Sequence, residues 1–379
     1  MERAHFNHAG MSVTPRSVVA AMRAHLDLED ELGGYEAAAA ATDAIDRVPQ
    51  QLARLIGATA DEVCATESAS RAWELALWPT ADALDLSVGD RIIIDQFSYA
   101  TVYSSLVRLA SARGVEIVVA PALDDGSVDP ERLIELIDDR TRIIVVTHMP
   151  THLGTVTDVA DIGRRLEGSD AVYVVDVSQT VGQRRVDVTE IGCDVAFAPG
   201  RKFLRAPRST GLLYVRQSLA DRLVPLVPPF GSVDPASPGS FDLPTGMRRF
   251  DLFEYAVAAR LGLGEAARLA VEIGLDRIAG EMAVRSRQVI DLLDSIRGIE
   301  RTGTDSDVGI ISFVHRDHDA TDVQEQLASQ GVNVWINTAG GAPVDAAVRG
   351  RFPTVRVSPH HVTTDDDIDR LDRALRSLT

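Results

Sequence analysis

Ala171-Val-Tyr-Val-Val-Asp176 is the stretch that decides the fold, because five largely apolar residues in a row end on a single carboxylate. Three earlier stretches have a similar form: Asp90-Arg-Ile-Ile-Ile-Asp95, Val115-Glu-Ile-Val-Val-Ala120 and Arg142-Ile-Ile-Val-Val-Thr147. Apolar runs of this length are typical of strands that are buried on both faces of a parallel sheet. We therefore predict one parallel sheet that contains all four stretches.

Amphipathic segments separate these strands, at residues 98–113, 130–139 and 159–166. Strands that alternate with helices in this way are typical of an α/β doubly wound domain. Short apolar stretches near residues 194–198 and 211–215 would close the sheet. The sequence therefore predicts a large α/β domain.

The pattern changes after a stretch rich in proline, glycine and serine, residues 227–246. Beyond it we predict helices at residues 251–273, 275–296, 320–330 and 364–377, and strands at residues 309–314, 332–336 and 354–358. This order is typical of an α+β domain. We therefore divide the chain into an N-terminal segment (1–30), a large α/β domain (31–250) and a smaller C-terminal α+β domain (251–379), linked by a long helix.

The composition narrows the possible functions. The net charge is −18, and because nucleic-acid backbones select basic surfaces, no nucleic-acid partner is expected. No stretch reaches the ~18 apolar residues of a membrane helix, and the first ten residues contain no apolar signal-peptide core. We therefore expect no membrane partner and a cytoplasmic location. Cys64 and Cys193 have no metal-ligand spacing, so no metal is expected.

Lys202 is the only lysine in the sequence, although 38 residues are lysine or arginine. Arginine can replace lysine wherever a solvated cation is sufficient. It cannot replace a lysine whose amine must lose its proton and attack a carbonyl group, because the guanidinium stays charged. Lys202 is therefore a candidate for amine chemistry, and the alternative is a chance surface lysine.

Asp176 lies at the carboxyl end of its predicted strand, where open α/β sheets bind their ligands. A carboxylate at this place can pair with the protonated nitrogen of a pyridine ring. Gln179, three residues further on, could hydrogen-bond a phenolic oxygen of the same ring. The alternative is that Asp176 is the N-cap of a helix.

The lysine lies in Ala198-Pro-Gly-Arg-Lys-Phe-Leu-Arg-Ala-Pro-Arg-Ser-Thr-Gly211. Arg201, Arg205 and Arg208 place it in a cationic field, which favours the neutral amine. Arg201 also offers a planar fork for a phosphate. The alternative for this segment is a basic surface loop.

Three further segments offer ligand contacts. Thr66 and Ser68 stand where a strand passes into a helix, and a helix N-terminus binds phosphate well. Tyr99 follows another strand and either stacks on a flat ring or packs in the core. Arg356 lies on an apolar strand and either forms a structural ion pair or holds a substrate carboxylate in a bidentate manner.

Together these residues resemble the class V aminotransferase group of fold-type I pyridoxal-phosphate enzymes, which includes cysteine desulfurases, isopenicillin N epimerase-like proteins and ergothioneine-pathway C–S lyases. The resemblance covers nearly the whole chain through these segments: Phe6-Asn-His-Ala-Gly10, Gly33-Gly-Tyr-Glu-Ala37, Ala65-Thr-Glu-Ser68, Asp176 to Gln179, Arg201-Lys-Phe203 and Thr354-Val-Arg-Val-Ser358. It implies a large domain with a mainly parallel seven-stranded sheet between helices, and a smaller C-terminal α+β domain.

The resemblance also implies a role for each site residue. Lys202 would form the Schiff base with pyridoxal 5'-phosphate and later carry the proton, and Asp176 would keep the ring nitrogen protonated. The remaining roles are contacts: Gln179 with the ring oxygen, Tyr99 with the ring face, Ala65, Thr66 and Arg201 with the phosphate, and Arg356, Thr151 and His152 with the substrate. The group further implies a homodimer with its active site at the subunit interface.

One departure from the group bears on the reaction. Cysteine desulfurases need a mobile thiolate in the loop that corresponds to Asn337-Thr-Ala-Gly-Gly-Ala-Pro343, and this loop has no cysteine. We therefore expect a C–S lyase that performs β-elimination on an S-substituted cysteine. An aminotransferase, an epimerase or a decarboxylating deaminase acting through the same Lys202 Schiff base is the alternative, and a binding protein that has lost the chemistry is a third.

Overall fold

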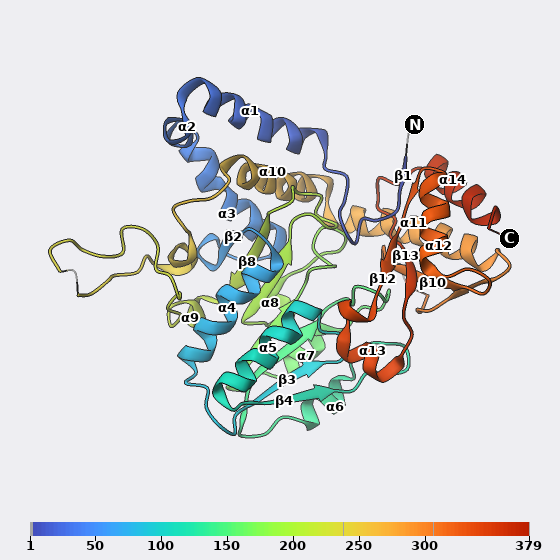
Figure 1. Ribbon diagram of the computed structural model, residues 1–379. Coiled ribbons are helices and arrows are strands. Elements are labelled where there is room, and N and C mark those ends of the chain that lie inside the picture. The colour runs from blue at the N-terminus through green and yellow to red at the C-terminus, as the bar shows by residue number, and fades with distance from the viewer. Residues whose placement is uncertain (1–2, 238, 306, 379) are drawn as a thin grey trace.

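The structure, a computed structural model, describes residues 3–237, 239–305 and 307–378. Its centre is a seven-stranded sheet with the order β2-β8-β7-β6-β5-β3-β4 (Figure 1). The strands are β2 (Val63–Thr66), β3 (Arg91–Asp95), β4 (Glu116–Ala120), β5 (Thr141–Thr147), β6 (Val172–Asp176), β7 (Val195–Pro199) and β8 (Gly211–Val215). Only β8 runs antiparallel to its neighbours within this sheet of described residues, so the predicted, mainly parallel seven-stranded sheet is confirmed.

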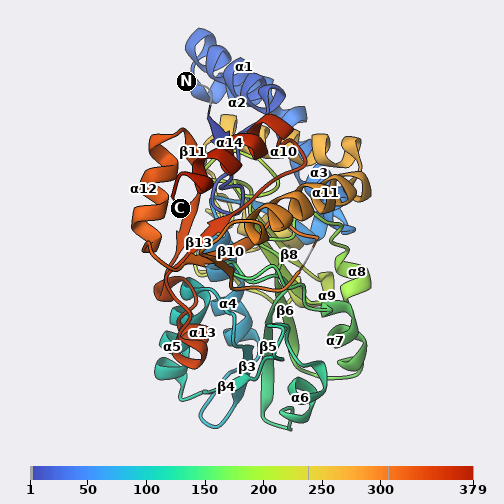
Figure 2. The ribbon, with the colours of Figure 1, turned by 90° about the vertical axis from the view of Figure 1, so that its right-hand side faces the viewer.

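The sheet is covered by helices on both faces, which explains the continuous apolar runs. Along β6, Val174 packs into one apolar cluster, whereas Tyr173 and Val175 pack into a second cluster on the opposite face. The helices of the large domain are α3 (Thr42–Ile56), α4 (Ala69–Ala83), α5 (Ala100–Arg113), α6 (Pro130–Glu135), α7 (Val159–Arg165), α8 (Val188–Ile191) and α9 (Gln217–Ala220). Figure 2 shows α5 and α7 on opposite sides of the strands.

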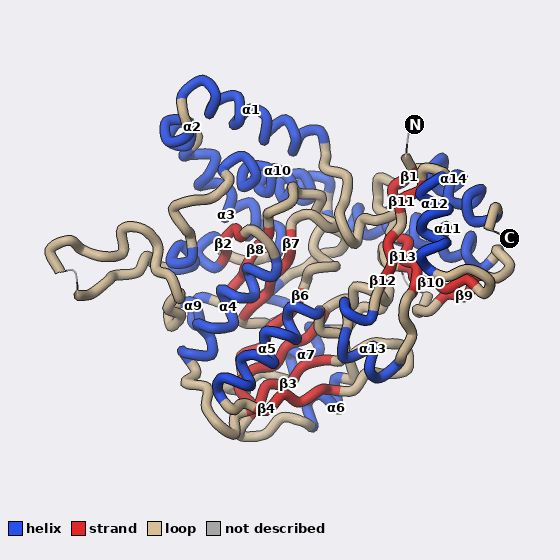
Figure 3. Tube along the Cα trace, in the orientation of Figure 1, coloured by secondary structure: helices blue, strands red, loops and turns tan. Residues whose placement is uncertain are grey.

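The smaller domain is built around a four-stranded antiparallel sheet with the order β12-β13-β10-β9. Its strands are β9 (Ile299–Arg301), β10 (Ile311–His315), β12 (Trp335–Asn337) and β13 (Thr354–Val357), and its helices are α11 (Leu275–Asp294), α12 (Ala320–Ser329), α13 (Pro343–Arg349) and α14 (Asp365–Arg376). Figure 3 shows this sheet beside the large domain. The predicted C-terminal α+β domain is therefore present.

The N-terminal residues contact both domains. The short strand β1 (Ala4–His5) pairs in parallel with β11 (Val332–Asn333) of the small domain. The chain then continues to α1 (Arg16–Leu32) and α2 (Gly34–Ala40). α10 (Val257–Ile273) packs against both α1 and α3 and leads to α11. The domain boundaries at residues 30 and 250 stay predictions.

Two expectations about local structure are wrong in detail. Residues 332–336 form two strands, because β11 pairs with β1 whereas β12 pairs with β13. Helix α13 was not expected. Its seven residues, all of them described, bury only the polar residue Asp345, so they lack the apolar repeat by which a helix is recognised in a sequence. No helix of the described residues combines the length and the apolar character that a membrane crossing requires.

Candidate active site

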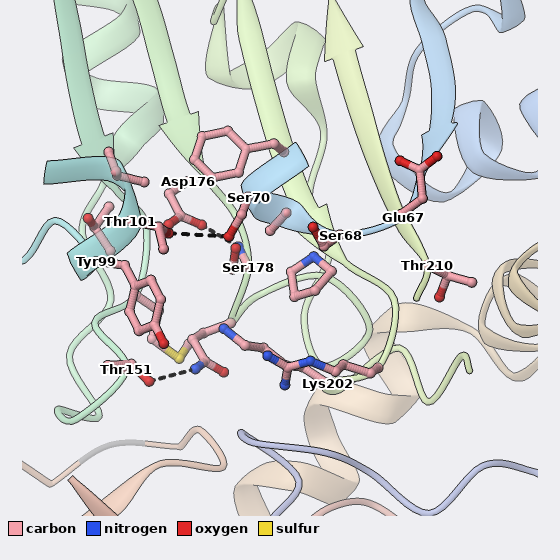
Figure 4. A pocket seen from close by; sticks show the side chains of 18 of the residues that line it. Glu67, Ser68, Ser70, Tyr99, Thr101, Thr151, Asp176, Ser178, Lys202 and Thr210 are labelled. Carbon is pink, nitrogen blue, oxygen red and sulfur yellow. Dashed lines mark hydrogen bonds between the residues drawn. The ribbon is translucent and has the colours of Figure 1, made fainter. Parts of the chain in front are cut away.

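The carboxyl ends of the parallel strands form the floor of a cavity of about 250 Å³, which we call the inner cavity. β5, β6 and β7 end there at Thr147, Asp176 and Pro199, and all three residues line it. Figure 4 shows Asp176, Tyr99 and Lys202 around this space. Because open α/β sheets bind ligands at this edge, the inner cavity is the candidate active site.

Lys202 follows β7 by three residues, and its Nζ lies 5.9 Å from the centre of the Tyr99 ring. The pKa of this amine is lowered from 10.5 to about 7, mainly by burial; Asp176 opposes the decrease, and Arg201 and Arg356 add to it. A substantial fraction of the amine is therefore neutral at pH 7. The neutral amine is the form that attacks carbonyl carbon.

The cause of the lowered pKa differs from the prediction. Arg201, Arg205 and Arg208 were expected to supply it, but burial is the largest cause. Arg205 instead donates from Nε to the Val13 carbonyl at 3.1 Å. The cation that the prediction missed is Arg356, which reaches the site from the small domain.

Asp176 is 7% exposed, and burial raises the pKa of its carboxyl group against the opposing effects of Lys202 and Ser178. Its Oδ1 accepts a hydrogen bond of 2.8 Å from the backbone N–H of Ser178. The helix N-cap alternative is wrong, because the described residues 177–186 form turns and no helix. The carboxylate therefore remains available to a protonated ring nitrogen in the cavity.

Gln179 is buried, and its amide is partly used by the protein itself. Nε2 donates to the Ala9 carbonyl at 3.2 Å and to Thr151 Oγ1 at 3.0 Å. Oε1 is buried and has no hydrogen-bond partner among the described residues. A buried polar atom without a partner is costly, so a ligand that satisfied this amide would be stabilised at the cavity wall.

Arg356 lies on β13 and is 2% exposed. One guanidinium nitrogen donates to the Thr151 carbonyl at 2.7 Å and to Thr151 Oγ1 at 2.9 Å, and the other donates to Asn7 Oδ1 at 3.4 Å. Burial lowers its pKa to about 9, an effect that Tyr99 opposes. No described carboxylate pairs with it, so the structural ion pair is not observed, and a fork of this kind suits a substrate carboxylate.

The predicted phosphate contacts are only partly placed at the cavity. The N-terminus of α4 lines the inner cavity through Ser68, Ala69 and Ser70, and the Ser68 side chain caps the helix at Arg71 N. Ala65 and Thr66, the last two residues of β2, are absent from the described lining. The part of this segment that faces the cavity, where a phosphate could bind, therefore begins after Thr66.

Arg201 lines the inner cavity together with Arg208 and Thr210. Its guanidinium donates to the Gly10 carbonyl and pairs with no described carboxylate, so charge remains available for an anion. Arg208 is exposed in the same loop. The loop therefore brings two guanidinium groups to the cavity wall, where a phosphate would be attracted.

A second space, which we call the outer cavity, adjoins the inner one and measures about 530 Å³. Both cavities are lined by Tyr99, Thr151, Arg201, Lys202 and Arg208. The outer cavity is otherwise lined mainly by the small domain and the N-terminal segment, including Asn7, Trp335, Asn337, Thr338, Gly340, Gly341, Ala342, Phe352 and Arg356. Its described lining contains no aspartate or glutamate, in a chain whose net charge is −18.

His152 lines the outer cavity, but its ring is held by another residue. Its Nε2 lies 2.8 Å from Asp345 Oδ2, and the side chains of both residues are about 5% exposed or less. The expected contact between His152 and the substrate therefore stays a prediction. Its observed bond is structural.

The two cysteines lie away from both cavities. Cys64 is 1% exposed and Cys193 is 0% exposed. Burial is the main cause that raises the pKa of each thiol, and neither residue is among the described lining of the two cavities. Neither thiol can therefore meet a substrate in this conformation.

Asp95 is a buried carboxylate behind the inner cavity that sequence reasoning missed, and it holds two residues of the cavity wall, Phe97 and Thr147. It ends β3 as Asp176 ends β6, and its Oδ1 accepts from Phe97 N at 2.6 Å and from Thr147 Oγ1 at 3.3 Å. Burial raises the pKa of its carboxyl group to about 6. The signal was present in the sequence, because the stretch Asp90 to Asp95 also ends on a carboxylate.

The residues around the inner cavity fit pyridoxal 5'-phosphate. The partly neutral amine matches the aldehyde, the buried carboxylate of Asp176 matches the ring nitrogen, and the N-terminus of α4 matches the phosphate. The amide oxygen of Gln179 has no hydrogen-bond partner among the described residues, and a polar ligand in the cavity could supply one. Fold and site thus define the class: a fold-type I enzyme that depends on pyridoxal phosphate.

The chain belongs to the aminotransferase class-V family, whose sequence pattern matches residues 4–371. A probable cysteine desulfurase of Methanothermobacter thermautotrophicus is 29% identical over 384 residues, which cover 100% of this chain and 95% of that protein. The family resemblance and the cofactor are therefore confirmed.

Two solved structures show the same fold. Apo cysteine desulfurase of Thermococcus onnurineus has a TM-score of 0.90 and 22% identity, with 99% of this chain and 94% of that chain covered. A cystine C–S lyase in complex with its reaction product, cysteine persulfide, has a TM-score of 0.86 and 19% identity, with 99% and 97% covered. At these identities the likeness concerns the fold alone.

Proposed function

We propose that this chain is a C–S lyase that performs β-elimination on an S-substituted cysteine. The observation that carries the proposal is the outer cavity, whose 530 Å³ adjoin Lys202 and whose described lining contains no thiol. A free cysteine adds only a thiol beyond its β-carbon and would leave most of this space empty. A bulky substituent on sulfur would fill it.

The cofactor, when bound, supplies the electron sink that stabilises negative charge on the substrate Cα. The chain would hold it through the amine of Lys202, the carboxylate of Asp176, the Tyr99 ring, and the phosphate contacts of Arg201 and the α4 N-terminus. We assign Gln179 to the ring hydroxyl as an acceptor, because its Nε2 already donates twice and its Oε1 has no partner in the described part of the chain. We assign the backbone N–H groups at residues 68–70 to the phosphate as well, next to the predicted contacts of Ala65 and Thr66.

The other steps belong to the chain's own groups. Arg356 and Thr151 would orient the substrate carboxylate, and the near-neutral pKa of Lys202 lets its Nζ accept the Cα proton. The Cβ–S bond then breaks, and the electron pair leaves with sulfur into the outer cavity, where Arg201 and Arg208 favour the departing thiolate. Water converts the remaining three-carbon fragment to pyruvate and ammonia.

The test is product analysis. The holoenzyme is incubated with a panel of cysteine S-conjugates of increasing size, and pyruvate, ammonia and free thiol are measured. We expect the three products in equal amounts, with no turnover by the Lys202→Ala variant. Absence of pyruvate across the panel would contradict the proposal.

The names of the relatives favour a second candidate, a cysteine desulfurase. Against it stand the two thiols, which are both buried and absent from the described lining of both cavities. Alanine produced from cysteine would support this candidate. A keto acid that retains the sulfur would indicate transamination. Inversion at Cα would indicate an epimerase, and release of carbon dioxide would indicate a decarboxylating deaminase.

We also propose the homodimer that the resemblance implies. An exposed apolar surface supports it: Phe230 is 83% exposed, Tyr35 72% and Phe253 58%, and the Phe253 ring lies 5.1 Å from the Phe230 ring and 6.0 Å from the Tyr35 ring. Sedimentation equilibrium tests it, and a monomer at micromolar concentration would contradict it. The cytoplasmic location stays a prediction.

A further inference from the structure

The short helix α13 is attached to the molecule in an unusual way. All seven of its residues are described, and the one buried among them is a carboxylate, Asp345, which is 3% exposed. Val348, the largest apolar residue near its end, is 64% exposed. The helix lies beside α5 of the large domain in both Figure 1 and Figure 2. Its attachment therefore depends on polar contacts more than on apolar burial.

Asp345 is the centre of those contacts. Its Oδ1 accepts from Gln96 Nε2 at 2.6 Å and from Arg349 Nε at 2.6 Å, and its Oδ2 lies 2.8 Å from His152 Nε2. Burial acts to raise the pKa of this carboxyl group, but the three hydrogen-bonding side chains lower it to about 2. The carboxylate is thus ionised, and hydrogen bonds to it are of the strong, charge-assisted kind.

Both partners from the large domain stand next to site residues. Gln96 follows the end of β3 and precedes Tyr99 by three positions, and His152 directly follows Thr151, which holds Arg356. The third partner, Arg349, lies 5.0 Å from the centre of the Phe97 ring, which lines the inner cavity. The contacts of α13 therefore connect the small domain to the walls of the site.

The loop that precedes α13 covers the outer cavity. Thr338, Gly340, Gly341 and Ala342 all line it, and Asp345 follows the last of them by three residues. A Cβ built on Gly341 would meet nothing within 4 Å, so the loop is not held by tight packing at that point. The position of the loop thus follows from where α13 is anchored.

We propose that Asp345 is a positioning residue that latches the loop 338–342 over the outer cavity through Gln96 and His152, and so controls how the substrate enters. Segments that move in function have few buried apolar contacts, and α13 has this character. When the latch opens, Asp345 is exposed to water, which compensates for part of the lost hydrogen bonding. The inference rests on the proposed function only for the identity of the substrate, a bulky cysteine S-conjugate.

The first test needs no substrate. Hydrogen–deuterium exchange is measured on the holoenzyme and on its Asp345→Asn variant, which keeps the shape but removes the charge. Amides of residues 338–350 are expected to exchange at least about tenfold faster in the variant, as expected for loss of buried charge-assisted hydrogen bonds. The rest of the chain and the visible absorption of the lysine-bound cofactor should stay unchanged. Unchanged exchange in this segment would overturn the proposal.

A matched control is Asp161→Asn on α7. Asp161 Oδ2 pairs with Arg165 Nε at 2.7 Å across the same four-residue spacing as Asp345 and Arg349, but the pair lies on the surface. This variant should behave as the wild type in every measurement. A similar change in residues 338–350 would mean that the effect is not specific to the latch.

A second pair of variants separates the latch from general loss of structure. Gln96→His keeps an Nε2 donor for Asp345, whereas Gln96→Met removes it, and Gln96 is absent from the described lining of both cavities. The KM for the S-conjugate should stay within about twofold of wild type in the first and change about tenfold in the second, with kcat nearly unchanged in both. Equal effects of the two variants would overturn the proposal. If the lyase reaction itself is absent, the exchange experiment still decides whether the latch exists.

Discussion

The inner and outer cavities are walled in different ways. The inner cavity rests on the ends of β5, β6 and β7, whose registers are fixed by hydrogen bonds to neighbouring strands and by apolar packing on both faces. The outer cavity is bounded mainly by the N-terminal segment, the three-residue strand β12 and the loop 338–342, which leads into the polar-anchored helix α13. The difference indicates that the rigid cavity sets the chemistry, whereas the loop-built cavity selects the substrate.

The strongest test of the inner cavity is Lys202→Arg. A long basic side chain is kept but the amine that attacks the carbonyl carbon is lost, so the visible absorption of the bound cofactor should disappear and turnover should fall by at least about 10³-fold. Absorption spectra before and after borohydride treatment check the first result, and pyruvate release checks the second. A variant with wild-type turnover would remove the inner cavity from the reaction.

Arg356 lines the outer cavity and donates hydrogen bonds to Thr151, which lines both cavities, and its replacement tests whether it holds the substrate carboxylate. Arg356→Lys loses the planar fork, so kcat/KM should fall about 10- to 100-fold for an amino-acid S-conjugate. The matched substrate is the corresponding conjugate without the carboxylate, on which variant and wild type should be equally slow. If kcat/KM falls equally for both substrates in the variant, Arg356 holds something other than the carboxylate.

Buried histidines lie where the two domains meet, and acid should lower the stability of the fold through them. His8 and His360 have rings 4.8 Å apart, and burial lowers the pKa of both below the ordinary value of 6.5. Burial likewise lowers the pKa of His148, near the inner cavity, to about 4. The unfolded chain therefore binds more protons than the folded chain below pH 6.5.

Stability should accordingly be complete above about pH 6.5 and fall as the pH decreases towards 4, by up to about 1.4 kcal/mol per pH unit for each such histidine. Urea unfolding of the holoenzyme between pH 4 and 8 measures this. His148→Gln should reduce the slope of the unfolding free energy against pH by the contribution of one histidine, up to about 1.4 kcal/mol per pH unit. A stability that rises on acidification would contradict the assignment of neutral imidazoles.

The sequence predicted the inner cavity far better than the outer one. The strand ends at Asp176 and Thr147, and the lysine loop, are local features, because an apolar run, a carboxylate and the only lysine can be recognised without tertiary contacts. The phosphate contacts of Ala65 and Thr66 stay predictions, although the described lining of the inner cavity begins only at Glu67. The role of Asp345 could not be predicted, because two of its three partners, Gln96 and His152, lie 249 and 193 positions away in the chain.

Filling the outer cavity should change selectivity and leave the chemistry intact. Gly341→Leu places a side chain where a Cβ meets nothing within 4 Å, at a residue that lines the outer cavity. We expect kcat/KM to fall about tenfold for the bulkiest S-conjugates and to stay nearly unchanged for S-methylcysteine. Gly340→Ala, a smaller change beside it, is the control. An equal loss on small and large substrates would contradict the division between the cavities.

The smallest effect is expected from removing both thiols. Cys64→Ala and Cys193→Ala together should cost about 1 kcal/mol of stability each, because both side chains are buried in apolar clusters, and should leave turnover of S-conjugates within about twofold of wild type. A desulfurase that used either thiol to accept sulfur would instead lose nearly all turnover of cysteine. Measuring pyruvate from an S-conjugate and alanine from cysteine on the same double variant therefore separates the two reactions. Pyruvate release that is retained in the variant, with no alanine from the wild type or the variant, would place the thiols outside the reaction. Loss of turnover in a correctly folded variant would mean that a thiol does reach the substrate.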